Sequence, residues 1–186
     1  MGSEKWVDKV MIFIDGSNLF RTFKQFRPDI DYSIKKLVNI LIKGRKLIRP
    51  YYFGSIKYPP PEGQIKFYDG IRYEGIDVTT RPLKIRTRPC ECPTCKHQWT
   101  QTIEIEKGVD VALITKMLSF GFKNAYDVAI LVSGDADYIE AVEQIRDLGK
   151  RVEIISFKGA IAPGLRKIAD IDGFVALDDI ADQIKK

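Results

Sequence analysis

Apolar segments alternate along this chain with segments whose apolar residues recur at helical spacing. The segments expected to form strands are 10–14, 51–58, 76–80, 128–132, 152–157 and 174–177. Between them the pattern favours helices over 19–26, 34–41, 62–73, 109–120, 137–148 and 165–168, followed by a last helix capped by Asp178. Strands that alternate with helices predict an α/β fold with a mostly parallel sheet and right-handed crossovers.

Acidic residues follow two strands of this pattern that are apolar at every position, as central strands of a parallel sheet are. Asp15 comes directly after the first strand, and Asp135 and Asp137 follow the fourth strand across a short turn. Ligands of such sheets bind beyond the carboxyl ends of the strands. If these two strands are neighbours, we expect the three carboxylates to meet at one edge. Asp110 opens a later helix, and its position can face the same edge.

Clustered carboxylates of this kind favour a bound divalent cation. Left alone they repel one another and raise each other's pKa, whereas Mg²⁺ and Mn²⁺ prefer oxygen ligands. Such a metal can activate a water for attack on a phosphodiester and stabilise the leaving oxygen. Structural roles stay open: an Asx turn at Asp15 and a favourable helix-dipole position at Asp110. Asp137 and Glu140 have the spacing of a capping box.

The composition fits one globular domain, or one domain with an insert, in 186 residues. Hydrophobic residues make up 45% of the chain, so a sizeable core is expected and extensive disorder is not. The 30 basic and 25 acidic residues give a net charge of +5, which permits a polyanionic partner without establishing one.

The chain shows no signal for a membrane or for export. No run approaches the ~18 apolar residues of a membrane span. Four of the first ten residues are charged, namely Glu4, Lys5, Asp8 and Lys9, and the apolar run after them is too short for the core of a signal peptide. With three cysteines and no export signal, we expect the reducing environment of the cytoplasm.

Residues 82–105 differ in character from the rest and are interpreted as an insert. They contain every cysteine of the chain and its only histidine, as Cys90, Cys92, Cys95 and His97. The Cys92-x-x-Cys95 spacing is that of a zinc knuckle, so we expect a structural Zn²⁺ held by this Cys₃His set. All four ligands lie within eight residues, whereas structural zinc sites usually draw two of their ligands from a second segment. It stays open that one ligand is free, that a partner chain supplies one, or that Cys92 and Cys95 form a redox pair.

Basic residues accompany the cysteines on this insert. Arg86 and Arg88 are separated by one residue, so an extended strand would present both on one face. A basic strip beside an aromatic residue suits a nucleic-acid backbone and an unpaired base. The other interpretation is a solvated hairpin that its charges keep soluble. The residues concerned are Arg81, Lys84, Arg86, Arg88, Lys96 and Trp99.

Three motifs, in this order, resemble those of NYN domains, which belong to the PIN-like nuclease group. They are Ile14-Asp15-Gly16-Ser17-Asn18-Leu19, Lys107-Gly108-Val109-Asp110-Val111 and Ser133-Gly134-Asp135-Ala136-Asp137-Tyr138. Residues 152–154 and 165–177 are also similar to the LabA-like branch of that family. The resemblance covers most of the chain outside residues 82–103, so 1–186 is interpreted as a single NYN domain.

The resemblance implies a PIN-like, Rossmannoid α/β/α sandwich and a Mg²⁺- or Mn²⁺-dependent ribonuclease site. It assigns metal binding to Asp15, Asp110, Asp135 and Asp137. Asn18 matches a polar position beside the first aspartate, where it could hold a water or a phosphate. Lys107 matches a basic position that could offset carboxylate charge or contact a phosphate. Ser133 could position the third loop. PIN-like domains often dimerise, so a homodimer is a further option.

The leading hypothesis is a metal-dependent ribonuclease acting on single-stranded or structured RNA, with a metal-activated water as nucleophile. An endoribonuclease is the expected enzyme class, and the choice between endo- and exonucleolytic cleavage stays open. The second hypothesis is a non-catalytic RNA-binding or regulatory module on the same fold. A haloacid dehalogenase-type phosphatase is disfavoured because Ser17 stands where that family needs a second aspartate. A dinucleotide-binding Rossmann enzyme is disfavoured because no glycine-rich phosphate turn follows the first strand.

Overall fold

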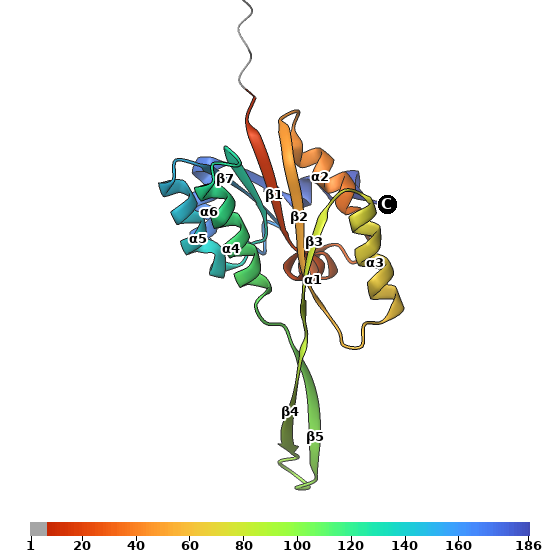
Figure 1. Cartoon of the computed structure of the whole chain (residues 1–186). Coiled ribbons are helices and arrows are strands. Elements are labelled where there is room, and N and C mark those ends of the chain that lie inside the picture. The colour runs from red at the N-terminus through yellow and green to blue at the C-terminus, as the bar shows by residue number, and fades with distance from the viewer. Residues whose placement is uncertain (1–6) are drawn as a thin grey trace, which may run out of the picture.

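The computed structural model describes residues 7–186 and contains a six-stranded sheet whose neighbouring strands are all parallel (Figure 1). The strands stand in the order β3-β2-β1-β6-β7-β8. Their bounds are β1 (Lys9–Asp15), β2 (Lys46–Ile56), β3 (Asp77–Pro82), β6 (Val128–Val132), β7 (Arg151–Ser156) and β8 (Phe174–Ala176). The α/β fold with a mostly parallel sheet is confirmed. Residues 1–6, part of the charged segment used against a signal peptide, lie outside the described range.

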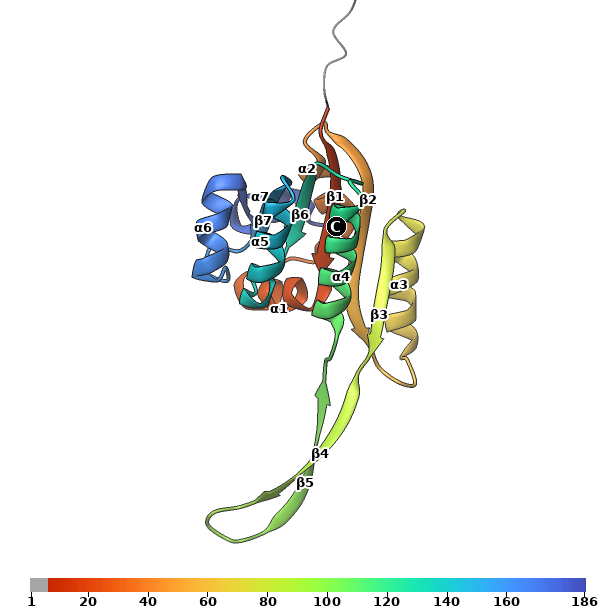
Figure 2. The same cartoon turned by 60° about the vertical axis from the view of Figure 1, so that its left-hand side comes forward.

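Helices cover both faces of this sheet (Figures 1 and 2). One face carries α1 (Gly16–Phe26), α2 (Ile34–Ile42), α3 (Glu62–Tyr73), α7 (Leu177–Ile180) and the 3₁₀ turn η2 (Ala181–Ile184). The other face carries α4 (Val109–Phe122), α5 (Ile139–Asp147) and α6 (Pro163–Asp172). Within residues 7–186, no helix combines the length and the apolar character that crossing a membrane requires.

The strand β1 shows why the sheet is central. Val10, Ile12 and Ile14 are buried in the core on one face, and Met11 and Phe13 are buried in the core on the other. Successive side chains of a strand point to opposite faces, so an uninterrupted apolar run is what two covered faces require. The α/β/α layering follows directly from this pattern.

The strand order reverses at β1. From β1 the chain adds β2 and β3 on one side and later places β6, β7 and β8 on the other. Ile14 pairs with Val132, so the carboxyl ends of β1 and β6 lie next to each other. Parallel sheets bind ligands in the crevice at such a switch point, because the connections leave the two strand ends in opposite directions. The fold thus brings together the segments that follow β1 and β6.

Two local predictions about helix starts differ from the structure. The helix expected over 137–148 begins with a 3₁₀ turn, η1 (Ala136–Tyr138), and becomes α-helical only in α5. Asp178 does not cap the last helix, because α7 already begins at Leu177 and Asp178 lies inside its first turn. The Asp178 carboxylate instead accepts a hydrogen bond from the Lys158 N–H (2.8 Å) and so ties α7 to the loop after β7.

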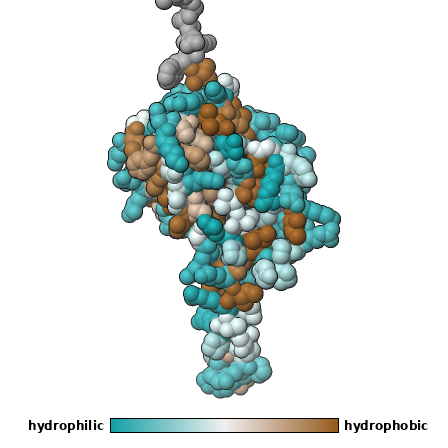
Figure 3. Space-filling model, viewed as in Figure 1, coloured by the Kyte–Doolittle hydropathy of each residue, from teal (hydrophilic) through white to brown (hydrophobic). Residues whose placement is uncertain are grey.

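A long hairpin leaves the body of the protein between β3 and α4 (Figures 1 and 2). Its strands, β4 (Lys84–Glu91) and β5 (Gln98–Ile105), pair in an antiparallel register, and most of their residues are exposed. The hairpin is the narrow projection at the bottom of the surface in Figure 3. Because β4 follows β3 almost directly, the hairpin projects from the carboxyl edge of the sheet. An ion pair between Lys57 and Glu104 (2.8 Å) connects its base to the segment after β2.

The close packing of the loop after β6 predicts a strong effect of Gly134→Ala. A Cβ atom at this position would overlap the Ala160 carbonyl oxygen and lie 2.5 Å from Ser156 Oγ. Overpacking of this kind costs about 1–3 kcal/mol, and each kcal/mol lowers the Tm by about 2–4 °C in a chain of this size. Thermal unfolding should therefore show a loss of several degrees.

Gly70→Ala is the matched control for this substitution. Gly70 lies on the exposed face of α3, and a Cβ atom there would meet nothing within 4 Å. Alanine favours a helix interior over glycine by up to about 1 kcal/mol, so this variant should unfold at or slightly above the wild-type temperature. Equal Tm values for the two variants would contradict the packing described for Gly134.

Candidate active site

A buried carboxylate, that of Asp15, lies at the carboxyl end of β1. Its side chain is 7% exposed. Asp15 caps α1, because its Oδ1 accepts a hydrogen bond from the Asn18 N–H (3.0 Å). Its Oδ2 accepts hydrogen bonds from the hydroxyls of Tyr138 (3.0 Å) and Ser133 (3.3 Å). The cap considered from the sequence is therefore present, and it coexists with contacts to the segment that follows β6.

Burial raises the pKa of the Asp15 carboxyl group. Desolvation is the largest cause, and the negative charge of Glu106 adds to it. The hydrogen bonds from the Asn18 N–H, the Tyr138 hydroxyl and the Ser133 hydroxyl act in the opposite direction without cancelling the rise. The ionised form of Asp15 is thus incompletely compensated by the protein, which is the condition under which a bound cation would stabilise it.

Two further aspartates, Asp110 and Asp135, lie near the Tyr138 hydroxyl, which donates a hydrogen bond to Asp15. The pKa of Tyr138 is raised, first by burial and then by the charges of Asp15, Asp110 and Asp135. The phenol therefore stays protonated and donates to Asp15. Asp110 stands in the first turn of α4, and Asp135 caps η1 after β6. The structure thus places Asp110 and Asp135 near Asp15, at the switch point between β1 and β6.

Asp137 occupies a different position. Its side chain is exposed, and its N–H donates to Asp135 Oδ1 (3.3 Å). The capping box considered for Asp137 and Glu140 is absent, since α5 starts after Tyr138 without a side-chain cap. Of the four predicted aspartates, Asp137 is therefore the one whose side chain is not placed beside Asp15.

Hydrogen bonds of Asn18 and Ser133 connect the segments that form the site. Asn18 is buried, and its Oδ1 accepts a hydrogen bond from the Gly134 N–H (3.4 Å). Ser133 is also buried, and its hydroxyl oxygen accepts a hydrogen bond from the Asp135 N–H (3.3 Å) while its hydroxyl donates to Asp15. These contacts connect α1 to the loop after β6. Lys107, by contrast, is exposed just before α4.

Sequence reasoning missed Glu106 and Arg21. Glu106 is exposed between β5 and α4, and its Oε2 accepts a hydrogen bond from the Ser17 hydroxyl (2.6 Å). Its charge also contributes to the raised pKa of Asp15. Arg21 of α1 approaches Asp135 at 3.9 Å. The only available signal for Glu106 was its place next to Lys107 in the second motif, because it follows no strand of the main sheet.

The oxygen donors at this edge fit a hard cation such as Mg²⁺ or Mn²⁺. Asp15, Glu106, Asp110 and Asp135 supply carboxylates of the type these ions prefer. Within residues 7–186, however, no three His, Cys, Asp or Glu side chains are gathered so as to hold a metal ion by themselves. Mg²⁺ commonly uses only one or two carboxylates together with waters and substrate phosphates. The donor set is therefore chemically suited to a metal that substrate helps to bind.

The structure does not support the zinc site predicted for Cys90, Cys92, Cys95 and His97. These four side chains form no metal-binding group within residues 7–186. Strand pairing continues to the tip, where the Cys92 N–H donates to the His97 carbonyl (2.9 Å). The imidazole of His97 stacks on the Trp99 ring with centroids 6.3 Å apart. The zinc prediction therefore has no support within the part of the chain that the structure describes.

The side chains of Cys92 and Cys95 are in hydrogen-bond contact, whereas Cys90 contacts other groups of the hairpin. Cys90 Sγ lies 3.7 Å from both the Arg88 carbonyl and Gln101 Oε1. Hydrogen bonds from the N–H groups of Cys95 and Thr94 lower the pKa of the Cys92 thiol. All three cysteines are free, so Cys92 and Cys95 do not form the disulfide that a redox pair would have in its oxidised state.

One face of the hairpin is basic. Lys84, Arg86 and Arg88 alternate along β4, so their side chains lie on the same face. Directly paired residues of an antiparallel ladder share a face, and Trp99 pairs with Cys90 two positions beyond Arg88. The expected strip of cations with an aromatic ring at its end is thus present, and it leads away from the edge of the sheet that carries Asp15.

The buried state of Asp15 predicts that Asp15→Asn stabilises the metal-free protein. A carboxyl group with a raised folded-state pKa contributes stability that is complete below the unfolded pKa of about 3.9. That contribution is lost as the pH rises through the folded-state pKa. In EDTA, the Tm of Asp15→Asn should exceed that of the wild type at pH 8 by a few degrees, and the difference should vanish toward pH 4.

Asp147→Asn serves as the control for this measurement. Asp147 is exposed at the end of α5, far along the helix from the site. Its substitution should leave the Tm within about 1 °C of the wild type at both pH values, as surface substitutions generally do. A lower Tm for Asp15→Asn than for Asp147→Asn at pH 8 would show that the hydrogen bonds of Asp15 outweigh its desolvation.

Comparison with known proteins assigns this arrangement to a family. Low amplitude and bright protein LabA of Synechococcus elongatus is 27% identical over 180 residues, which cover 96% of this chain and 88% of that protein. The crystal structure of a protein of unknown function from Vibrio parahaemolyticus superposes with a TM-score of 0.73 at 21% identity, over the full length of both chains. The model of the NYN domain matches residues 9–178, so this chain belongs to the NYN domain family.

Proposed function

We propose that this protein is a Mg²⁺- or Mn²⁺-dependent ribonuclease that hydrolyses RNA phosphodiester bonds where β1 and β6 end. The observation that carries the proposal is the buried Asp15 carboxylate at the switch point, with Asp110, Asp135 and Glu106 around it. Protein groups compensate this negative charge only in part, and a phosphate-bound cation is the complement that such a site lacks. Family membership supports the proposal, since NYN domains are generally nucleases that act on RNA.

The roles of the residues follow from their positions. Asp15, Asp110 and Asp135 would hold the metal, while Tyr138 and Ser133 orient the Asp15 carboxylate through their hydroxyls. When bound, such a metal supplies an activated water and stabilises charge on the leaving oxygen.

The remaining predicted residues act around this centre. Asn18 is a positioning residue, because its amide oxygen holds the loop that carries Asp135. Lys107 is exposed beside the second motif and would contact a substrate phosphate. Asp137 is exposed and would enter the site only through a rearrangement of η1. We therefore assign metal binding to the other three aspartates and place Asp137 outside the metal site.

The hairpin would hold the RNA that reaches this site. Lys84, Arg86 and Arg88 form a row of cations along β4. The hairpin starts at the carboxyl edge of the sheet (Figure 2), and the aspartates lie at the same edge. Phosphate contacts of this kind bind nucleic acid without regard to sequence. Trp99 at the end of the row offers a flat surface on which an unpaired base can stack. This division of labour favours single-stranded RNA.

A non-catalytic RNA-binding module is the second candidate. It is favoured by one observation: no group of three metal-ligating side chains is assembled within residues 7–186. In that case the hairpin would bind RNA as above, and the acidic edge would serve the fold only.

Cleavage of labelled RNA should depend on Asp135. Asp135→Asn should lower the rate with Mg²⁺ or Mn²⁺ by at least about 100-fold, because a charged group near the reacting phosphate is removed. EDTA should abolish cleavage by the wild type. The exposed Asp147→Asn variant should cleave at the wild-type rate. If wild type and Asp135→Asn both fail to cleave but bind RNA equally, the binding-module function replaces the nuclease.

RNA binding should depend on the basic face of the hairpin. Arg86→Gln with Arg88→Gln should weaken binding to single-stranded RNA and reduce the slope of log K against log salt by about 1.4, at ~0.7 per phosphate contact. Lys46→Gln with Lys123→Gln removes the same charge from exposed positions at the opposite edge of the sheet. This control should keep the wild-type slope. Equal slopes for both double variants would rule out the hairpin as the RNA-binding element.

A further inference from the structure

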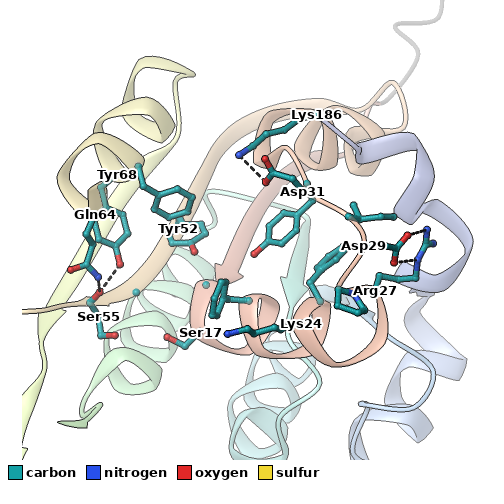
Figure 4. Close-up of a pocket in the computed structure, with 18 residues that line it drawn as sticks. Ser17, Lys24, Arg27, Asp29, Asp31, Tyr52, Ser55, Gln64, Tyr68 and Lys186 are labelled. Carbon is teal, nitrogen blue, oxygen red and sulfur yellow. Dashed lines mark hydrogen bonds and ion pairs between the residues drawn. The ribbon is translucent and has the colours of Figure 1, made fainter. Parts of the chain in front are cut away.

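A cavity of about 680 Å³ opens beside the candidate active site. It lies between α1, α3 and the end of β2, and its lining begins with Gly16 and Ser17, the two residues after Asp15 (Figure 4). Ligand pockets in proteins measure about 300–1,000 Å³. The cavity is thus large enough for a small organic molecule or for one nucleotide of a longer chain.

Six of its eighteen lining residues are aromatic. Tyr52 of β2 packs edge-on against Phe67 and Tyr68 of α3, with ring centroids 6.0 and 6.2 Å away. Phe20 of α1 also lines the cavity. Phe20 and Phe67 are 58% and 41% exposed, although both are large apolar residues. Two exposed aromatic rings at the mouth of an apolar cavity suit a flat ligand that stacks on them.

The hydroxyl of Tyr52 is a polar group at this cavity that has no hydrogen-bond partner within residues 7–186. Tyr52 is only 4% exposed, and no hydrogen bond to its hydroxyl occurs among residues 7–186. Its phenol end lies over Gly16, where a Cβ atom would overlap the ring. Figure 4 shows the Tyr52 side chain at the cavity, above Ser17. The residue as a whole is buried but its hydroxyl oxygen keeps accessible surface at the cavity, so the hydroxyl is available to a ligand.

Two other polar groups of the wall already have partners in the protein. The Ser55 carbonyl already accepts hydrogen bonds from Gln64 Nε2 (3.0 Å) and the Tyr68 hydroxyl (2.5 Å). Lys186 is paired with Asp31 (2.9 Å). The hydroxyl of Tyr32, which also lines the cavity, has no hydrogen bond among residues 7–186, so the cavity offers two free hydroxyls, those of Tyr52 and Tyr32.

The mouth of the cavity also carries a positive charge. Lys24 of α1 lines the cavity and places its ammonium group 5.5 Å from the centroid of the Phe20 ring. No ion pair of Lys24 occurs among residues 7–186. A ligand that stacks on Phe20 would bring its own phosphate within reach of this cation. The aromatic rings and the free hydroxyls suit the base of a nucleotide, and the cation at the rim suits its phosphate.

We infer that this cavity is a nucleobase subsite, which takes the base of an RNA nucleotide next to the phosphate held at the Asp15 edge. The inference rests on the proposed ribonuclease function for its biological meaning. The base would stack on Phe20 and Phe67, and its edge would hydrogen-bond to the Tyr52 hydroxyl. The deep position of the cavity requires a base that is unpaired, so the subsite selects single-stranded RNA.

Binding of mononucleotides in EDTA tests this subsite separately from catalysis. Uridine and adenosine 5′-monophosphates should bind the wild type in saturation-transfer NMR, whereas ribose 5-phosphate, which lacks a base, should not. Phe20→Ala should weaken binding at least about fivefold through the lost stacking. Tyr52→Phe, which removes only the hydroxyl, should weaken it about two- to tenfold. Phe122→Ala removes a ring that is 69% exposed at the end of α4 and should bind as the wild type does.

The possible results separate the subsite from the nuclease. Absent mononucleotide binding, or equal binding by all variants, would overturn the subsite. Binding that responds to Phe20 and Tyr52 in a protein that cleaves no RNA would support the subsite and refute the nuclease. If RNA is cleaved and Phe20→Ala and Tyr52→Phe leave the KM for single-stranded RNA unchanged, the nuclease stands and the subsite does not.

Discussion

The burial of the Asp15 carboxylate is the constraint on which the rest of the site depends. One side chain accepts hydrogen bonds from the backbone of α1, from Ser133 after β6 and from Tyr138 of η1. Desolvation of the charge opposes folding, as the raised pKa of Asp15 indicates. The same three contacts define where α1 and the loop after β6 stand relative to each other. Stability and the geometry of the acidic edge are therefore coupled through this residue.

The carboxyl edge of the sheet carries two opposite charges in separate places. The aspartates and Glu106 gather where β1 and β6 end. The hairpin that carries the basic face begins beyond β3 and extends outward, as Figure 2 shows for its backbone. Acidic and basic groups placed in one pocket would neutralise each other. Their separation leaves the acidic edge in need of a cation and the hairpin in need of an anion. The ribonuclease proposed above would use both, with the aromatic cavity between α1 and α3 beside them.

Much of the fold could be predicted because its signals are local. The uninterrupted apolar runs at 10–14 and 128–132 reflect burial on both faces, and the structure places them side by side as β1 and β6. Helix starts were harder, because a cap depends on where the first turn begins, and α7 begins one residue before Asp178. The zinc site has no support in the structure: ligand type and spacing suited a metal, but within residues 7–186 the four side chains form no metal-binding group. Whether side chains surround one point depends on tertiary geometry, which spacing along the chain does not specify.

The sequence by itself determined the α/β class, the family motifs and the presence of acidic residues at strand ends, since these depend on residue type and on spacing along the chain. Only the tertiary structure decided which residues share an environment. It brought Glu106 from the end of the hairpin to Ser17, left Asp137 exposed and placed Tyr138 between three carboxylates. It also assembled an aromatic cavity from α1, β2 and α3. Contacts between distant segments arise from strand order and helix packing, which no local pattern encodes.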